Sequence, residues 1–344
     1  MSFTVTLHPS GKRFEPADGE SVLAAALRNG LNLPHSCRGG SCMSCQARIV
    51  SGQVSYPRGT PVALSASDLA ADQALLCQAV ATSDLEVEIA PLETPGNICI
   101  RRLPCRVQRA RRLCPDVMEL ALKLPGFEPF EYLAGQYVDI LLSNGERRSF
   151  SIANPPHAAE LLEIHVRRVP GGRFSDYVFE DMKPRALLRL EGPLGQFYLR
   201  EDRARPIMLV GGGTGYGPLK AMLAHAFHLG WDRPVHLYWG VRARIDLYDQ
   251  QHLLDWSTTH PGFHFVPVLS EPGDDEEWQG RTGFVHEAVV ADFPDLSGWD
   301  VYMAGPPPMI EAARNLFPRH GLPQPQLFFD SFDYAQPLEG KPQD

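Results

Sequence analysis

Apolar and polar residues alternate over two short stretches of the N-terminal region, residues 3–7 and residues 85–89. Such alternation is typical of a strand with one buried face. Between these stretches, residues 21–29 are rich in alanine and leucine and stop before Gly30, which predicts a short helix. The pattern therefore predicts a small α+β domain over residues 1–92.

Short apolar runs separated by turn residues recur over residues 100–203. The runs expected to form strands are residues 117–124, 137–142, 161–166 and 187–190. Many short strands joined by regular turns predict an antiparallel β-barrel. One short helix is expected within this region, over residues 174–180.

Strands and helices alternate over residues 204–335. A buried strand at residues 207–210 runs into a glycine-rich loop, and a helix is expected at residues 218–229 after it. Further strands are expected at residues 235–241, 263–269 and 301–304. This alternation predicts a doubly wound α/β domain around a parallel sheet, and so a multidomain chain.

The overall charge and hydropathy exclude several classes of partner. The chain has 32 basic and 41 acidic residues, a formal net charge of −9, which argues against nucleic-acid binding. No apolar run reaches the roughly 18 residues that a membrane span needs, and the first residues do not resemble a signal peptide. We therefore expect a cytoplasmic protein with no membrane partner. Nothing in the pattern suggests an interface helix, so we expect a monomer.

Four of the seven cysteines have a spacing that suits a metal cluster. Cys37, Cys42 and Cys45 form a C-x4-C-x2-C pattern, and Cys77 follows 32 residues later. This is the arrangement of plant-type [2Fe–2S] sites. A zinc site or buried structural cysteines are the alternatives, but zinc favours two C-x2-C pairs and only one is present. The cysteines that fit no ligand spacing, and that we interpret as thiols outside the cluster, are Cys99, Cys105 and Cys114.

Three loops of the predicted α/β domain follow strands of one sheet. Residues 211–218, with the sequence GGGTGYGP, join a strand to a helix and could present backbone N–H groups to a pyrophosphate. Gly240–Arg242 and Ala304–Met309 end two other strands. Because the carboxyl ends of parallel strands meet at one edge, these loops predict a dinucleotide site there. A glycine-rich connection without a ligand is the alternative.

The barrel region carries the sequence R-S-F-S at residues 148–151. An arginine can neutralise a pyrophosphate, an aromatic ring can pack on a flavin, and the Ser151 hydroxyl could reach the flavin N5. Residues 171–175 open the short predicted helix and suit a second phosphate contact. Without its context, so short a motif is more typical of a surface strand.

These motifs together resemble known families along nearly the whole chain. Residues 34–45 with residues 75–79 resemble the plant-type ferredoxin domain, which has the β-grasp fold. The R-S-F-S, GGGTGYGP and G-P-P-P-M (305–309) sequences resemble the flavin and nicotinamide motifs of the ferredoxin–NADP reductase superfamily. Two positions depart from these family patterns. Met43 stands where the ferredoxin family commonly has a small residue, and Ala304 stands where many reductases have a cysteine that helps to position the nicotinamide.

The resemblance implies an NAD(P)H-dependent oxidoreductase that carries a [2Fe–2S] cluster and FAD and uses NADH, with NADPH as the alternative. Electrons would pass from NADH to FAD, then singly to the cluster and to a partner, because a flavin handles both one and two electrons. Asp246 would disfavour a 2′-phosphate, whereas Arg242 and Arg244 could bind one. The residues expected to take part in hydride transfer are Ser151, Thr214 and Gly305.

The residues expected to bind the cofactors come from the motifs above. For FAD and the nicotinamide coenzyme they are Arg148, Ser149, Phe150, Ser151, Gly171, Gly172, Ser175, Gly211, Gly212, Gly213, Thr214, Gly215, Pro218, Arg242, Asp246, Gly305, Pro306 and Met309. For the cluster they are Cys37, Cys42, Cys45 and Cys77.

The order of domains resembles two groups of reductases that differ in their partner. One group serves bacterial ring-hydroxylating or phenol-type oxygenases, and the other is the CDP-6-deoxy-3,4-glucoseen reductase type, which serves a sugar dehydratase. The N-terminal region slightly favours the second group. In both, the protein acceptor would dock near the cluster loop at residues 38–44. A free-standing flavin reductase and a non-catalytic, redox-responsive regulatory protein are the remaining alternatives, and only Ala304 argues for the last.

Overall fold

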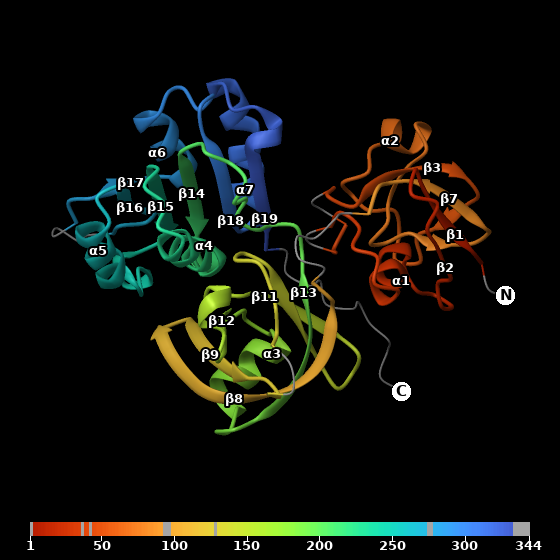
Figure 1. The fold of residues 1–344 in the computed structure, drawn as a ribbon, viewed down its shortest axis with the longest axis horizontal. Coiled ribbons are helices and arrows are strands. Elements are labelled where there is room, and N and C mark those ends of the chain that lie inside the picture. The colour runs from red at the N-terminus through yellow and green to blue at the C-terminus, as the bar shows by residue number, and fades with distance from the viewer. Residues whose placement is uncertain are drawn as a thin grey trace. The chain divides into compact units, whose positions relative to one another are not determined.

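The computed structural model describes residues 3–35, 38–40, 43–91, 98–126, 129–273 and 278–332. The described chain forms two compact units, one reaching from residue 3 to residue 91 and the other spanning Ile98–Ser331 (Figure 1). Within the described chain, no helix has both the length and the apolar character needed to cross a membrane.

The first unit is a five-stranded mixed sheet with the strand order β2-β1-β7-β3-β5. Its central pair, β1 and β7, is parallel, and the other pairs are antiparallel. The alternating residues Val5, Leu7 and Val87 are fully buried, and helix α1 buries its alanine- and leucine-rich face. This is the predicted β-grasp domain. Its elements are β1 (Val5–His8), β2 (Arg13–Phe14), α1 (Val22–Arg28), β3 (Gln46–Ser51), β4 (Val54–Ser55), α2 (Ala66–Ala70), β5 (Gln73–Leu75), β6 (Val80–Ala81) and β7 (Leu85–Glu88).

The second unit begins with a six-stranded antiparallel sheet of order β11-β10-β13-β8-β9-β12. A bridge between Ile152, which follows β11, and Ile164 of β12 links the two edge strands, so that the sheet closes into the predicted barrel. Apolar side chains from every second position fill its interior. Its strands are β8 (Arg101–Cys114), β9 (Val117–Lys123), β10 (Tyr137–Leu141), β11 (Arg147–Ser151), β12 (Leu162–Arg167) and β13 (Leu187–Leu194).

A helical segment packs against the barrel core at the position where the sequence predicts a helix. It consists of helix α3 (Arg173–Asp176) and a wider π-helical turn, η3 (Tyr177–Asp181). Phe174 and Val178 are the buried residues that join the barrel core. Only the first four residues are α-helical, so the segment is shorter and looser than an ordinary helix.

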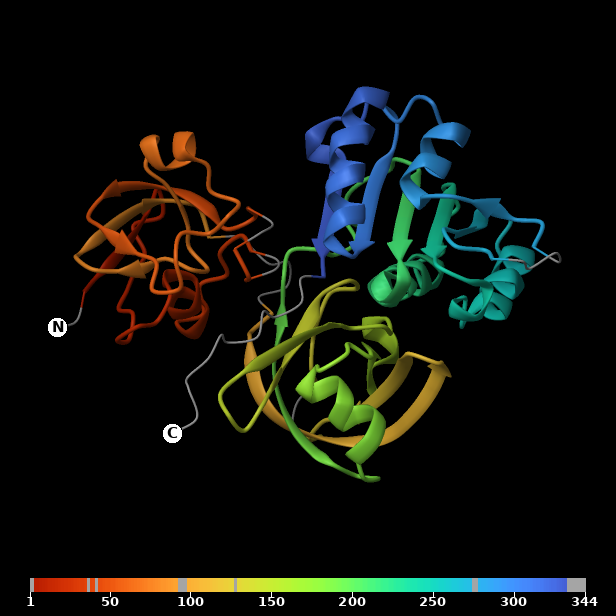
Figure 2. The same cartoon turned by 180° about the vertical axis from the view of Figure 1, so that it is seen from behind.

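The rest of the second unit is a parallel sheet of order β17-β16-β15-β14-β18-β19, whose longer strands point the same way in Figure 2. Gly211 faces Leu219 of α4, and the next residue, Gly212, faces Met309 of α7, so helices cover both faces. The elements are β14 (Ile207–Gly212), α4 (Tyr216–His228), β15 (Val235–Val241), α5 (Gln250–Thr259), β16 (Phe263–Leu269), β17 (Arg281–Thr282), α6 (Val285–Asp292), β18 (Asp300–Gly305), α7 (Pro307–Leu316) and β19 (Leu327–Ser331).

Strand β14 lies at the point where the order of this sheet reverses. The chain runs from β14 outward through β15, β16 and β17, and then returns to β18 on the other side of β14. In open α/β sheets such a switch point leaves a crevice at the carboxyl ends of the strands, where ligands bind. The doubly wound fold predicted from the sequence therefore places the glycine-rich loop at the switch point.

Candidate functional site

The three loops predicted to bind a dinucleotide lie at one edge of the parallel sheet. In the strand register, Gly211 is opposite Ala304 of β18 on one side and Trp239 of β15 on the other. Gly212 is opposite Gly240. Thus the carboxyl ends of β14, β15 and β18 meet side by side, as the order of the motifs suggests.

Close packing explains why this edge is rich in glycine. A Cβ atom on Gly215 would lie 1.9 Å from the Ala304 carbonyl oxygen, and one on Gly212 would lie 2.6 Å from the Met309 sulfur. Gly305 has a φ of +152°, and a Cβ added there would lie 3.0 Å from the Gly212 backbone. Side chains at these positions would therefore separate the loops. Helix α4 begins at Tyr216 directly after these glycines, and the start of a helix attracts anions.

An aromatic group beneath the glycine loop was not predicted from the sequence. The Trp239 Nε1 donates a 2.9 Å hydrogen bond to the Gly213 carbonyl oxygen, and the Tyr216 ring stacks on Trp239 with centroids 4.3 Å apart. The Tyr216 hydroxyl donates to Asp249 over 2.6 Å. Burial raises the pKa of Tyr216, and the Asp249 carboxylate raises it further, so this donor keeps its proton. These contacts hold the glycine-rich loop in place. No sequence motif predicts them.

The barrel contributes a histidine to the same aromatic group. The His165 Nδ1 lies 3.1 Å from the Tyr248 hydroxyl. Burial lowers the pKa of His165 to about 3, because it disfavours the charged imidazole, and the nearby Lys220 and Arg111 act in the same direction. His165 is therefore neutral at physiological pH, and its uncharged ring packs beside Gly217 at the start of α4.

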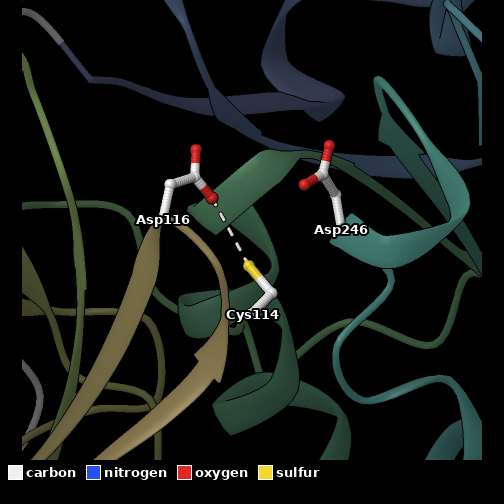
Figure 3. A group of neighbouring side chains, drawn as sticks. All are labelled: Cys114, Asp116 and Asp246. Atoms are coloured by element: carbon white, nitrogen blue, oxygen red, sulfur yellow. Dashed lines mark hydrogen bonds between the residues drawn. The ribbon is translucent and has the colours of Figure 1, made fainter.

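Two arginines and two aspartates form an ion-pair network after β15. Arg242 and Arg167 bind Asp116 of the barrel with nitrogen–oxygen distances of 3.2 and 2.9 Å, and Asp246 lies 3.9 Å from Arg242. Figure 3 shows the Cys114 thiol donating to Asp116, with Asp246 nearby. Burial raises the pKa of Cys114 to about 11, so it remains a thiol. Because the arginines already balance the carboxylates, we assign no metal to this group.

Arg167 is a second feature that the sequence did not single out. Its Nη1 lies 2.7 Å from the position that a Cβ on Gly213 would occupy. A guanidinium therefore stands against the loop predicted to bind pyrophosphate. Arginine suits that ligand because its planar donors match phosphate oxygens. No local sequence signal separates Arg167 from the other arginines of the barrel.

Arg148 and Phe150 of the R-S-F-S motif both have partners in the structure. Arg148 is half-buried and pairs with Glu146 at 2.7 Å. The Phe150 ring lies 5.4 Å from that of Phe174, against the barrel core. A partly exposed ion pair contributes about 0–1 kcal/mol, so a pyrophosphate could replace Glu146. Arg148 therefore fits the flavin phosphates, and the exposed part of Phe150 is left to contact a ring.

The two serines of the motif reach carboxylates on different strands. Ser149 Oγ donates to Asp139 of β10 over 2.7 Å, and Ser151 Oγ lies 3.5 Å from Asp330 Oδ2 at the end of β19. Asp330 is opposite Ala304 in the strand register. The barrel motif thus contacts, at Ser151, the strand that pairs with β18 beside the predicted nicotinamide loop. Asp330 was not predicted from the sequence, although the apolar run at residues 327–329 is a signal for one more parallel strand.

One tight turn at the start of α3 contains Gly171, Gly172 and Ser175. Ser175 Oγ accepts from the Val169 N–H over 3.2 Å and donates to the Gly172 carbonyl over 2.9 Å. The Ser175 hydroxyl therefore shapes the turn. A phosphate contact by these residues remains a prediction.

Of the four predicted cluster ligands, Cys45 and Cys77 lie in the described chain, and Cys37 and Cys42 lie outside it. Cys45 and Cys77 are buried, and the Leu76 N–H donates to the Cys45 carbonyl over 3.1 Å, which ties the two segments together. Burial raises the pKa of Tyr56, and Cys45 and Cys77 both add to that rise, so the two sulfurs lie near one phenol.

The backbone that precedes Cys45 turns sharply. Arg38 and Met43 have positive φ angles of 53° and 62°, a region that side chains disfavour. Gly40 also has a positive φ, and its position faces Gln78, whose amide donates to the Arg38 carbonyl over 2.7 Å. This strained loop, held against the Cys77 segment, fits a cluster that must be wrapped closely by backbone.

The three cysteines outside the predicted cluster should differ in reactivity because they differ in burial. Burial raises the pKa of Cys105 to about 12 and that of Cys114 to about 11, whereas Cys99 is exposed. Because the thiolate is the reactive form, we expect iodoacetamide at pH 8 to modify Cys99 first and to spare Cys105 and Cys114 until the protein unfolds. Peptide mass spectrometry of the native holoprotein measures this order, and equal rates at all three positions would contradict it.

Comparison with known families agrees with the geometry. A 2Fe-2S iron-sulfur cluster binding domain matches residues 5–82, an oxidoreductase FAD-binding domain matches residues 104–198, and an oxidoreductase NAD-binding domain matches residues 209–315. The predicted cofactors, a [2Fe–2S] cluster, FAD and a nicotinamide coenzyme, are therefore confirmed at the level of the domains.

Relatives cover almost the whole chain. A CDP-6-deoxy-L-threo-D-glycero-4-hexulose-3-dehydrase reductase of Yersinia pestis is 41% identical over 96% of this chain and 99% of its own length. The reductase component DmpP of phenol 2-monooxygenase from Pseudomonas sp. strain CF600 is 34% identical over 96% and 95%. The solved cytochrome P450 reductase GcoB of Amycolatopsis superposes with a TM-score of 0.84 at 36% identity, covering 96% and 98%.

These matches span all three domains in the order in which the sequence motifs occur. The chain is thus an NAD(P)H-dependent oxidoreductase whose domains fit electron transfer from NADH to FAD to a [2Fe–2S] cluster. It belongs to the ferredoxin–NADP reductase superfamily, in the group whose members carry an N-terminal plant-type [2Fe–2S] domain.

Proposed function

We propose that this reductase supplies electrons to a dehydrase acting on a CDP-linked 6-deoxyhexulose, as the CDP-6-deoxy-3,4-glucoseen reductase type does. The observation that carries this proposal is the 41% identity to the Yersinia pestis reductase, which extends over 99% of that protein. The phenol 2-monooxygenase reductase component aligns over a similar length at 34%. The difference favours the sugar-modifying partner over an oxygenase.

The loops at the sheet edge would hold NADH by its phosphates. The pyrophosphate would lie on residues 211–215 at the start of α4, where backbone N–H groups and Arg167 meet. Thr214 is half-buried, and its hydroxyl would face the nicotinamide together with the backbone of Gly305. Ala304 is fully buried and has no thiol, so positioning here relies on the backbone contacts of Gly215 and Gly305.

The R-S-F-S motif would hold FAD across the gap from the nicotinamide loop. Arg148 would bind the flavin pyrophosphate, and Ser151 would face the reactive edge of the ring. Bound flavin accepts two electrons as a hydride and releases them singly. The Ser151 hydroxyl donates to Asp330, which would hold its oxygen in place beside the ring. Exact placement of the two rings would supply most of the catalysis, because hydride transfer needs no acid or base.

Coenzyme preference should depend on the carboxylates around Arg242. Asp116 and Asp246 engage the guanidinium that would otherwise bind a 2′-phosphate. We expect Asp116→Asn to raise the kcat/KM ratio of NADPH to NADH about tenfold, because a charged hydrogen bond contributes about 1.5–3 kcal/mol. Steady-state kinetics with both coenzymes and ferricyanide measures the ratio.

A matched variant separates this effect from a general loss of charge. Glu180→Gln removes a barrel carboxylate that pairs with Arg168, and the NADPH to NADH ratio should not change in it. An unchanged ratio in Asp116→Asn, or an equal rise in Glu180→Gln, would contradict the assignment of Asp116.

The cluster would be held by Cys37, Cys42, Cys45 and Cys77 and would pass single electrons to the partner. The partner would dock near residues 38–44, the segment that carries Arg38. We further propose that the reductase is a monomer and that its domains span residues 1–92, 100–203 and 204–335.

Anaerobic titration of the loaded protein with NADH, and then with NADPH, tests the electron path. Absorbance reports the flavin, and low-temperature EPR reports the reduced cluster. Loss of flavin absorbance followed by a rhombic cluster signal is the expected result. A reduced flavin without a cluster signal would contradict the last transfer, and no response at all would favour a regulatory protein.

The choice of partner needs a second assay. The NADH-reduced protein should reduce its purified dehydrase partner in the presence of the CDP-sugar substrate. Transfer to an oxygenase component, with none to the dehydrase, would instead support the second candidate, which the likeness to GcoB and DmpP favours.

A further inference from the structure

Trp239 bonds the glycine-rich loop from inside the domain. It lies in β15, opposite Gly211 in the strand register, and it is fully buried. Its Nε1 donates a 2.9 Å hydrogen bond to the Gly213 carbonyl oxygen, which also accepts from the Tyr216 N–H. Two donors therefore hold the Gly213 carbonyl toward the buried indole.

The direction of this carbonyl sets the direction of the next N–H group. A trans peptide unit is planar, and its C=O and N–H point to opposite sides. Because the Gly213 carbonyl points at the indole, the Thr214 N–H points away from it. Gly213 and Thr214 are the two residues of this turn, η4 (Gly213–Gly215), that are not fully buried. The turn thus presents an N–H group on its accessible side, as a phosphate oxygen requires.

Tryptophan can hold this peptide in one orientation and not in the reverse. An indole N–H donates a hydrogen bond and cannot accept one, so it can hold a carbonyl but not an N–H group. A peptide turned the other way would leave the buried indole N–H without its acceptor, which costs free energy. It would also aim the Gly213 carbonyl at the coenzyme phosphates, which would repel it.

The loop needs this external bond, and the indole that supplies it is itself fixed. Residues 211–213 are three successive glycines, whose backbone has the widest conformational freedom. The Tyr216 ring stacks on Trp239 with centroids 4.3 Å apart, and the Tyr248 ring meets it edge-on at 5.0 Å. These two rings restrict the rotation of the indole, so its N–H stays aimed at Gly213.

We propose that Trp239 is a positioning residue for the coenzyme pyrophosphate, because its N–H orients the Gly213–Thr214 peptide and so directs the Thr214 N–H at a phosphate oxygen. A donor that is oriented in advance avoids the cost of ordering the loop on binding. Being fully buried, Trp239 acts through the loop and not on the coenzyme. The inference rests on the proposed placement of the pyrophosphate on residues 211–215.

Kinetics of the cluster- and FAD-loaded protein with two hydride donors tests this role. Trp239→Phe keeps an aromatic ring against Tyr216 and removes the N–H. It should raise KM for NADH about tenfold, the size of one lost hydrogen bond to a charged group, and leave kcat nearly unchanged. With N-benzyl-dihydronicotinamide, which has no phosphate, the variant should react as fast as the wild type. Ferricyanide is the acceptor in both assays.

Binding of ADP-ribose gives a readout that does not depend on turnover. This ligand keeps the pyrophosphate and lacks the nicotinamide, so titration calorimetry should show about tenfold weaker binding to Trp239→Phe. Benzothienylalanine at position 239 keeps the shape of the indole and replaces its N–H with sulfur. It should reproduce both losses, which excludes an effect of ring size.

The matched control is Trp256→Phe. It removes an indole of helix α5 that packs edge-on against Phe227 at 5.3 Å. The variant should match the wild type with NADH, with ADP-ribose and with the benzyl donor. The flavin and iron content of every variant should equal that of the wild type.

Three results would overturn the inference. They are an unchanged KM for NADH in both replacements at position 239, an equal loss with N-benzyl-dihydronicotinamide, and a similar rise of KM in Trp256→Phe. Failure of the proposed function is separate, because a wild-type flavin that NADH does not reduce would contradict the electron path before any variant is compared.

Discussion

Replacing Gly215 with alanine should lower kcat/KM for NADH about 100-fold, because a displacement of about 1 Å at a reacting site can cost that much. The added Cβ would lie 1.9 Å from the Ala304 carbonyl oxygen and 2.4 Å from its carbon. Both are backbone atoms of a central strand and cannot move aside cheaply. The glycine loop must then separate from β18, and the pyrophosphate and nicotinamide contacts separate with it. Steady-state NADH:ferricyanide kinetics measures the loss.

A second glycine in the same segment provides the control. A Cβ on Gly217 would meet its nearest atom, His165 Nδ1, at an ordinary 3.5 Å. Alanine also favours a helix more than glycine does, so Gly217→Ala should keep its activity. The flavin and iron content of both variants should match the wild type. Similar kinetics in the two variants would contradict the view that the contact with β18 positions the coenzyme.

Replacing Cys77 with serine should remove the cluster and keep the flavin reaction. An alcohol is a poor substitute for a thiolate ligand of an iron–sulfur cluster. We expect no EPR signal from a reduced cluster, iron content at background and loss of cytochrome c reduction. Ferricyanide reduction, which can draw electrons from the flavin directly, should continue. This division of activities would place the cluster after the flavin in the electron path.

Cys99→Ser is the matched control, because Cys99 is exposed and fits no ligand spacing. It should retain the cluster and both activities. The assignment of Cys77 fails if Cys77→Ser keeps its cluster, or if Cys99→Ser loses it as well. Loss of flavin from Cys77→Ser would instead indicate general misfolding, which circular dichroism would reveal.

The local pattern of apolar and polar residues predicted the fold class of each domain, but it did not predict all of the strands. The strands at residues 235–241 and 263–269 coincide with β15 and β16 because both are apolar over most of their length. Strand β8 was missed because it carries six arginines. Side chains that point outward from a barrel face solvent or form ion pairs, so a barrel strand can be rich in charged residues. Arg111, for example, binds the buried Glu119 of β9 at 2.7 Å, and a pairing of that kind follows no local rule.

The sequence by itself determined the chemistry of this protein. The C-x4-C-x2-C spacing, the glycine-rich loop and the R-S-F-S motif each depend on neighbours within a few residues, so they can be recognised along the chain. The number of domains and their fold classes also follow from local periodicity.

Only the tertiary structure decided which distant residues act together. Asp330 beside Ser151, Arg167 beside Gly213, Asp116 on Arg242 and Trp239 against Gly213 all join segments that are far apart in the sequence. Such contacts depend on strand order, barrel closure and the packing of the barrel against helix α4. Because these are properties of the whole fold, no spacing along the chain can encode them.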